Sequence, residues 1–455
     1  MLNSFELSGL WWLPENPENK IHGKLRYNSQ KRTTLFLDGT FNKNPEEGDF
    51  YEIALGDSYG KKITLKNCLR SNLEIKRYPD SREYMTSEFV VSVFYVGWHF
   101  AKKEDIKFTR LFVRYSQLEE WLGERPFHFE VSKNEEGLEE HMIKFTMPNV
   151  KEIILDGFKI SIGYGFSERM DVWKKPEFEA HAWISVDVSD EMHIDEFFPI
   201  VYHIKNFLGF ATGNTVSILD ITGQNKNMDS HETIQISYHE EVSEEKLFEP
   251  PFLPFQYNSI SERPEFYLQN WFDMIKNLEP TYDLFFGTMY NSHLYPTHAF
   301  LSLAQALESY HSRTFDNDVM PDEAFNPILS QILEIIGKIP QGYQQHFKTK
   351  ASYMNRKSLR RRIKELFEKY GELFRPFIDD ENEFIGKVVD TRNYFTHYSP
   401  ESEKGAAKVI DIPFLSQNLR FILIVIFLKE IGFDDAFARQ VLTRYMRFRI
   451  RRIFA

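Results

Sequence analysis

The residues best suited to chemistry lie in the stretch VVDTRNYFTHYSP, residues 388–400, which contains Arg392, Asn393 and His397. An imidazole can move a proton near neutral pH, a guanidinium can stabilise added negative charge, and an amide can orient a neighbouring group. Cleavage of RNA by its own 2′-hydroxyl requires these functions and needs no metal ion. On spacing alone the pattern is weak, because the polar end of an ordinary helix gives the same residues.

The spacing of apolar residues predicts a helix over residues 384–398 to position this cluster. Four of its residues, three or four apart, would face the core: Phe384, Val388, Thr391 and Phe395. Pro400 disfavours helical backbone at the residue before it, so His397 would lie in the last turn. There the helix dipole favours a protonated imidazole, whereas a nearby guanidinium opposes it.

The wider pattern predicts an α+β fold, with an N-terminal β-rich domain followed by a C-terminal helical bundle. Short aromatic and β-branched runs, several of them alternating, fill the first 240 or so residues. One helix is expected among them, over residues 195–213, where Gly213 suits a helix end. Beyond residue 258 the apolar period becomes helical, as in FLSLAQALESYHSR (300–313), and five or more helices are predicted.

The expected boundaries are 1–245 for a β-rich sensor or regulatory domain, 246–258 for a linker and 259–455 for the helical domain. The linker is predicted because the segment turns from acidic to proline-rich. The β-rich part forms either one domain or two subdomains with a break near residues 131–141.

Charge is unevenly distributed along the chain, whose formal net charge is −12. Lys and Arg minus Asp and Glu is 0 for residues 1–130, −20 for 131–340 and +8 for 341–455. The basic excess gathers around residues 346–370 and at the C-terminus. Basic clusters in an acidic protein indicate a surface for a polyanion, although solvated helix faces are also often charged.

Most enzyme signatures are absent from the sequence: GxGxxG, GxxxxGK[ST], GxSxG and HExxH do not occur. With one cysteine, Cys68, the chain can form neither an intramolecular disulfide nor a cysteine-based zinc site. His293 and His298 lack nearby acidic partners and are interpreted as structural. We therefore expect no metal site and no cofactor.

A cytoplasmic location without membrane attachment is predicted. A single cysteine suits a reducing compartment, and the N-terminal residues lack the basic and apolar regions of a signal peptide. The longest apolar run, Phe421 to Leu428, has eight residues, whereas a membrane-spanning helix needs about 20. This run is expected to be a fully buried helix.

Two stretches resemble a known family. DTRNYFTHY (390–398) is similar to the signature of HEPN domains, an arginine followed by a polar residue and then a histidine, and FLSLAQALESYHSR resembles a helix of the same family. Near the N-terminus, LSGLWWLPENPENKIHGKLRY (7–27) is similar to the opening of ApeA-type anti-phage proteins. Together the two similarities cover most of the chain in the right order.

The resemblance implies a metal-independent endoribonuclease that defends bacteria by abortive infection, cutting RNA, with tRNA a reasonable substrate, after an unknown phage-derived trigger. It also implies a homodimer or higher oligomer in which Arg392, Asn393 and His397 of two chains form one composite site. Products would carry 2′,3′-cyclic phosphate and 5′-hydroxyl ends. Many members add an acidic residue from the first helix, for which Glu308 is the candidate here, although a lone helical Glu is more often solvated or ion-paired.

Further candidates for RNA binding lie in the basic helix NRKSLRRRIK (355–364), from which we choose four residues: Arg356, Arg360, Arg361 and Lys364. An exposed charged face explains the same residues equally well. The C-terminal arginines bind either RNA or the acidic middle of the chain. Trp11 and Trp12 are expected in a core or interface, and Tyr394 and Tyr398 are expected to pack rather than to stack on a base.

Two other hypotheses remain open. The helical bundle is alternatively a catalytically inactive HEPN module for dimerisation or RNA binding, since some family members have lost nuclease activity. A metal-dependent nuclease is the third reading. Incubation with RNA under EDTA separates all three.

Overall fold

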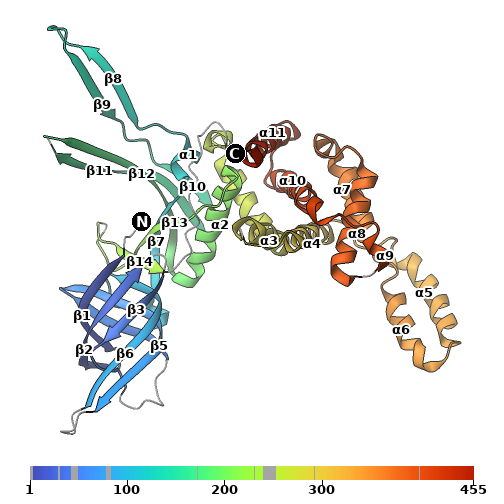
Figure 1. Cartoon of the computed structure of the whole chain (residues 1–455), viewed down its shortest axis with the longest axis horizontal. Coiled ribbons are helices and arrows are strands. Elements are labelled where there is room, and N and C mark those ends of the chain that lie inside the picture. Colours follow the sequence, from blue (N-terminus) through green and yellow to red (C-terminus); the bar gives the residue numbers. More distant parts are fainter. Residues whose placement is uncertain are drawn as a thin grey trace. The chain divides into compact units, whose positions relative to one another are not determined.

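A computed structural model describes residues 4–28, 31–42, 50–77, 83–171, 173–229, 231–238, 253–291, 293–398 and 400–454, without the side chains of 31, 83 and 447–454. The chain divides into two compact units, Met1–Glu265 and Phe266–Ala455 (Figure 1). The first is built mainly from strands and the second from helices. The α+β class and the order predicted from the sequence are thereby confirmed.

The first unit contains all the strands of the described residues, one long helix and three short ones. Its strands are β1 (Phe5–Leu13), β2 (Asn16–Asn28), β3 (Lys31–Leu37), β4 (Phe50–Ser58), β5 (Lys61–Arg77), β6 (Glu83–Val96), β7 (Lys107–Tyr115), β8 (Phe127–Lys133), β9 (Glu139–Phe145), β10 (Lys151–Leu155), β11 (Phe158–Asp171), β12 (Lys175–His193), β13 (Ile218–Gln224) and β14 (Ile234–Tyr238). Its helices are η1 (Lys103–Asp105), α1 (Leu118–Leu122), α2 (Ile194–Thr212) and η3 (Tyr257–Ser259). Gly213 ends α2 with φ 71°, as predicted.

Twelve strands form one antiparallel sheet in the order β10-β11-β12-β7-β13-β14-β6-β3-β2-β1-β4-β5. Because β5 also pairs with β6, the last six strands close into a ring. Buried and exposed side chains alternate along β2, which gives the strand one face for the inside of the ring and one for solvent. Ile21, Leu25 and Tyr27 are buried between exposed neighbours. The remaining strands, β8 and β9, pair only with each other within the described part of the chain.

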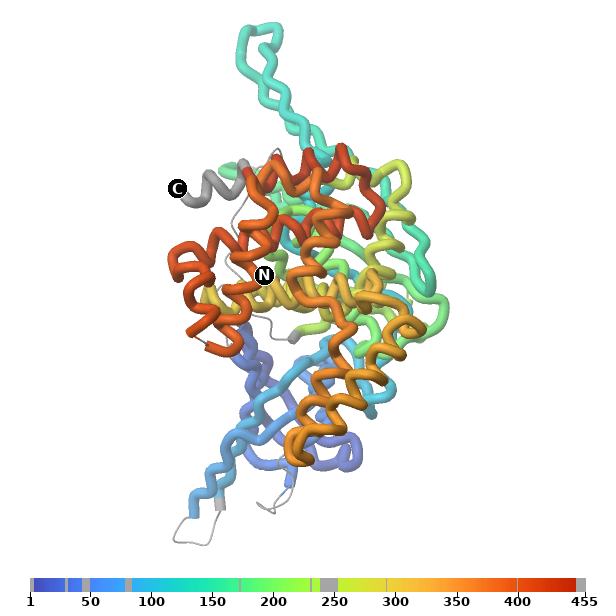
Figure 2. Tube along the Cα trace, turned by 90° about the vertical axis from the view of Figure 1, so that its right-hand side faces the viewer, coloured from blue at the N-terminus to red at the C-terminus, as the bar shows by residue number. Residues whose placement is uncertain are grey.

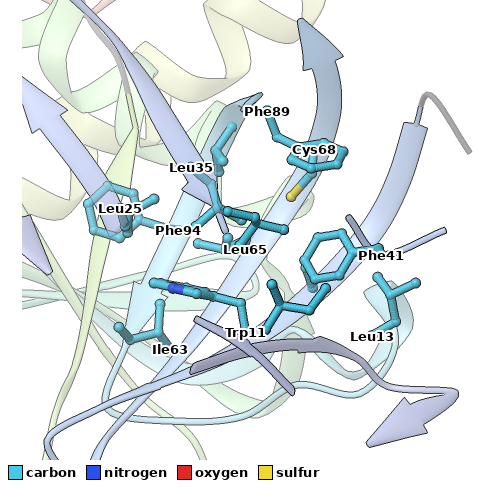
Figure 3. Close-up of a cluster of buried hydrophobic side chains, with 14 of the residues drawn as sticks. Trp11, Leu13, Leu25, Leu35, Phe41, Ile63, Leu65, Cys68, Phe89 and Phe94 are labelled. Atoms are coloured by element: carbon cyan, nitrogen blue, oxygen red, sulfur yellow. The ribbon is translucent and has the colours of Figure 1, made fainter. Parts of the chain in front are cut away.

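Trp11 lies fully buried in the core of the ring, among residues that include Leu25, Leu65 and Phe94 (Figure 3). Its indole needs glycine beside it, because a Cβ on Gly56 would lie 2.3 Å from the ring. Trp12 is 8% exposed. The prediction that the tryptophan pair belongs to a core is confirmed.

The expected linker at residues 246–258 lies in part outside the described residues. From Leu253 onward the segment packs on the first unit: Phe255 contacts the rings of Phe207 and Phe210, and the Gln256 side chain donates to the Glu120 carbonyl. Residues 131–141, the suggested break between subdomains, fall within the β8–β9 hairpin.

The second unit is helical throughout its described part. Its helices are α3 (Pro264–Tyr290), α4 (Pro296–Thr314), α5 (Asp322–Gly337), α6 (Gln341–Ser352), α7 (Leu359–Phe374), α8 (Glu381–His397), α9 (Pro400–Glu403), η4 (Val409–Asp411), α10 (Ile412–Glu430) and α11 (Asp435–Phe454). Helix α4 packs against α7, α8 and α10, whereas α5 and α6 form a hairpin of their own.

Helix α10 supplies the apolar centre of this unit. Every residue from Phe421 to Leu428 is at most 5% exposed, so the predicted buried helix is confirmed. By length and composition, Val409–Glu430 is also the one helix of the described residues that could cross a membrane, with half of its apolar window buried. A core helix meets the same criteria, so this finding is weak support for a membrane span.

Candidate functional site

Helix α8 carries the Arg392 cluster, and its ends follow from its sequence. The Asp380 carboxylate accepts a hydrogen bond of 2.9 Å from the Glu383 amide and caps the N-terminus. At the other end Tyr398 adopts a left-handed conformation with φ 51°, so the helix stops at His397. His397 therefore lies in the last turn, as the sequence predicts.

The buried face of α8 agrees with the predicted face except at one residue. Phe384, Val388 and Thr391 are buried, but Phe395 is only partly buried. In the last turn its ring packs on Tyr394 and Tyr398, with centroids 5.1 and 6.2 Å away. Phe395 was thus wrongly placed in the core, because the helix period continues past the point where neighbouring helices cover it.

Arg392 is held by two side chains. Its Nη2 lies 3.3 Å from Glu308 Oε2 on α4, and its Nη1 donates to Asn393 Oδ1 at 3.3 Å. Arg392 and Glu308 are each about one third exposed at their side chains (33% and 34%). The three residues thus form a polar group that solvent, and a bound anion, can reach.

His397 is exposed and follows Asn393 by one helical turn. No hydrogen bond joins its imidazole to another of the described residues. Five residues along a helix correspond to a rotation of about 140°, so Arg392 and His397 point to different sides of α8. The structure joins Arg392, Asn393 and Glu308 by hydrogen bonds, and His397 makes none with them.

The four candidates for RNA binding fall into two groups. Arg356 pairs with Asp318 at 3.2 Å, and Arg361 donates to Glu365 at 2.8 Å. Arg360 instead lies against α8: its guanidinium nitrogens are 3.7 and 3.8 Å from the position that a Cβ on Gly386 would take. Lys364 is exposed on the next turn.

Gly386 precedes Arg392 by six residues, which is about 9 Å along the helix axis. Arg360 therefore adds a second positive charge beside α8, about 120° around the helix from the direction of Arg392. The fold thus places Arg360 directly against the helix that carries the cluster.

Sequence reasoning missed a buried ionic network one turn from Glu308. His311 on α4 is fully buried, and its Nε2 lies 2.7 Å from Glu365 Oε2 on α7. On its other side, Arg362 Nη1 lies 3.3 Å from His311 Nδ1 and donates to Asn317 at 2.7 Å. Lys357 donates to Glu365 at 3.0 Å. The position of His311 on the apolar face of 300–311 was the available signal.

The geometry explains the protonation of this network. Burial, together with the Arg362 guanidinium facing Nδ1, lowers the pKa of His311, although the Glu365 carboxylate opposes the change. The neutral imidazole donates from Nε2 and accepts at Nδ1. Burial acts to raise the pKa of Glu365, but hydrogen bonds from His311 and Lys357 outweigh it and lower that pKa.

The segment that follows His397 folds back onto α8. The Ala407 amide donates to Thr391 Oγ1 at 2.8 Å, and Lys387 Nζ donates to the Gly405 carbonyl at 3.3 Å. Gly405 packs so closely that a Cβ there would lie 2.1 Å from Asp390 Oδ2. We call residues 400–408 the strap, since they fasten the end of α8 to its preceding turns.

No group of three or more His, Cys, Asp or Glu side chains in the described residues is arranged to hold a metal ion. The side chains of the C-terminal arginines Arg447, Arg449, Arg451 and Arg452 lie outside the described residues. Arg444 is described and partly buried.

Family models match both halves of the sequence. A model described as ApeA N-terminal domain 1 matches residues 6–271, and one described as Apea-like HEPN matches residues 301–437. The chain belongs to the ApeA-like HEPN proteins. Arg392, Asn393, His397 and Glu308 all lie within the HEPN match. Neither the curated proteins nor the solved structures provide a match.

Membership supports an anti-phage effector of the HEPN type. HEPN domains are generally related to ribonucleases, and they commonly dimerise and bind RNA. The two matched families are the ones that the DTRNYFTHY and LSGLWWLPENPENK stretches resemble.

Proposed function

We propose that this ApeA-like protein is a metal-independent endoribonuclease whose active site combines α8 of two chains. The observation that carries the proposal is the arrangement on α8 itself. Arg392 is positioned by Glu308 and Asn393 and accessible, while His397 is exposed on another side of the helix. A second chain facing this helix end can bring its own His397 and Arg392 to the same phosphate.

Two imidazoles and two guanidiniums account for the chemistry. One His397 removes the proton of a ribose 2′-hydroxyl, whose oxygen attacks the adjacent phosphorus. Arg392 stabilises the extra negative charge on the pentacovalent phosphorus, and the second His397 protonates the departing 5′-oxygen. The expected products carry 2′,3′-cyclic phosphate and 5′-hydroxyl ends.

The remaining assignments extend the same proposal. Substrate RNA, of which tRNA is one candidate, would lie along Arg360 and Arg392 in the cytoplasm. The β-rich domain, proposed as residues 1–245, would keep the nuclease inactive until a phage-derived trigger binds. The helical domain, proposed as residues 259–455, would carry the dimer contact.

The separation of Arg392 from His397 within one chain also favours a second candidate, an inactive HEPN module. In that case the exposed basic residues would retain RNA without cutting it. The two candidates differ in whether new RNA ends form.

The decisive experiment is end-mapping of RNA incubated with the purified full chain under EDTA. New 5′-hydroxyl ends that disappear in a His397→Ala variant support the nuclease. His397 is exposed, so its removal should leave the melting temperature unchanged, and His346→Ala, another exposed histidine, is the matched control. RNA retention without new ends favours the inactive module. RNA cleavage that occurs without EDTA and stops when EDTA is added indicates a metal-dependent nuclease.

A further inference from the structure

The β8–β9 hairpin is a two-stranded ribbon that projects from the first unit, visible as the turquoise hairpin at the top of Figure 2. Isolated two-stranded ribbons are marginally stable in water. This one is anchored at its base, where Phe127 and Phe145 lie 6.5 and 4.3 Å from the Phe166 ring of β11. Beyond the base, its side chains are exposed.

One face of the ribbon carries uncovered apolar side chains. Side chains alternate along each strand, so Phe129, Val131 and Ile143 share the face of the anchoring phenylalanines. They are 73%, 61% and 46% exposed. Exposed apolar surface of this density on a projecting element indicates an interaction site.

The free edge of β9 is ready to accept another strand. Asn134 donates to the Leu138 carbonyl and Thr146 to the Pro126 carbonyl, which fixes the even-numbered pairs as the hydrogen-bonded ones. The odd residues of β9 therefore direct their N–H and C=O groups away from β8. Within the described part of the chain no strand lies beside that edge.

The charges of β9 select a partner. If a second β9 runs antiparallel about a two-fold axis at Met142, Glu140 of each copy faces Lys144 of the other. These facing positions are non-hydrogen-bonded pairs, in which side chains approach most closely. His141 and Ile143 then exchange the backbone hydrogen bonds. Moving the axis by one residue loses both charge pairs.

The outer edge of β8 offers no register that pairs lysine with glutamate, although an axis at Phe129 would place His128 opposite Glu130. An axis at Glu130 would place two carboxylates opposite each other, and an axis at Val131 would place Glu130 opposite Ser132. Self-complementary Lys–Glu pairs therefore distinguish β9 from β8.

We propose that the β9 edge binds β9 of a second copy of this chain, centred on Met142, giving a four-stranded sheet in the order β8-β9-β9-β8. The two-fold axis is perpendicular to the sheet, so Phe129, Val131 and Ile143 of both copies lie on the same face. There Ile143 of each copy faces His141 of the other across the new contact, and Phe129 and Val131 lie one strand further out. This contact is independent of the HEPN domain and of nuclease activity.

Disulfide trapping on the full chain tests the contact. A Met142→Cys variant places two thiols opposite each other, and mild oxidation should convert most of the protein to a disulfide-linked dimer. The native Cys68 does not compete, since burial raises the pKa of its thiol to about 12. Ser132→Cys, also exposed but on β8, is the matched control and should react at least about tenfold more slowly.

A charge exchange then tests the register. In the Met142→Cys background, Lys144→Glu replaces two attractions with two repulsions and should slow trapping about tenfold. Adding Glu140→Lys should restore the rate. All three positions are exposed, so the fold should be unchanged by circular dichroism. Equal trapping of the two cysteine variants, or a Lys144→Glu effect that Glu140→Lys does not reverse, would overturn the proposal.

Discussion

Glu308 and Arg392, 84 residues apart in the sequence, meet at 3.3 Å between Oε2 and Nη2. The contact joins α4 to α8 and sets the direction of the guanidinium. Both side chains are about one third exposed, so the pair contributes less than about 1 kcal/mol to the free energy of unfolding. Its main consequence is therefore expected in function rather than in stability.

Glu308→Gln keeps the shape of the side chain but removes the charge that orients Arg392. We expect RNA cleavage to fall about 10- to 100-fold, because a misplaced guanidinium no longer stabilises the transition state. The melting temperature should change little. Initial cleavage rates and thermal unfolding measure the two effects, with the exposed Glu334→Gln on α5 as control. Full activity in the Glu308 variant would argue against a positioning role.

Arg360 and Arg361 are neighbours, yet they should respond differently to alanine. Arg360→Ala removes a cation beside Gly386, so RNA binding should weaken and its salt dependence should fall by about one ion, with stability unchanged. Arg361→Ala removes a partner of the buried Glu365 and should lower the free energy of unfolding by about 1 kcal/mol.

Binding isotherms at several salt concentrations and chemical denaturation separate these outcomes. Arg356→Ala is the control, since its guanidinium is paired with Asp318 away from α8. If all three variants lost affinity equally, a diffuse charged face would explain binding better than a path along α8.

His311 should make the helical unit sensitive to mild acid. Its pKa lies below the ordinary value of 6.5, so the folded state holds the neutral form and binds fewer protons than the unfolded state. The associated stability is present above pH 6.5 and is lost as the pH falls toward the lowered pKa, with a slope of at most about 1.4 kcal/mol per pH unit.

A His311→Gln variant should lose this pH dependence while being less stable at pH 7. Thermal unfolding of both proteins between about pH 7 and 5 measures the difference, and that range stays above the window in which Glu365 titrates. If the melting temperatures of wild type and variant changed with pH in the same way, His311 would not be the cause of the acid sensitivity.

Gly405→Ala should displace the strap. The new methyl group would lie 2.1 Å from Asp390 Oδ2, so the strap or the Asp390 side chain must move. Because the strap begins three residues after His397, we expect a lower cleavage rate together with a loss of about 1 kcal/mol in stability. Adding Asp390→Ala removes the clash and should recover most of the activity.

Gly371→Ala on α7 is the matched control, because its Cβ would meet Phe367 at an ordinary 4.0 Å. That change should be neutral or stabilising, since alanine suits a helix better than glycine. Unaltered cleavage by Gly405→Ala would show that the strap does not position His397.

The sequence by itself determined the local elements of this protein. Alternation predicts the strands of the ring, and the spacing of Phe384, Val388 and Thr391 predicts α8 and its buried side. Pro400 predicts that His397 lies in the last turn. These features depend on residues that are close in the sequence, so the spacing of apolar and polar residues is enough to predict them.

The tertiary structure decided which side chains meet across elements. It pairs Glu308 with Arg392, places Arg360 against α8 while tying Arg361 to Glu365, and buries His311 beside Arg362. It also leaves the last turn of α8 less covered than its period suggests, so Phe395 is only partly buried. Helix period fixes the direction of a side chain but not which element lies opposite, because packing between distant segments sets that partner.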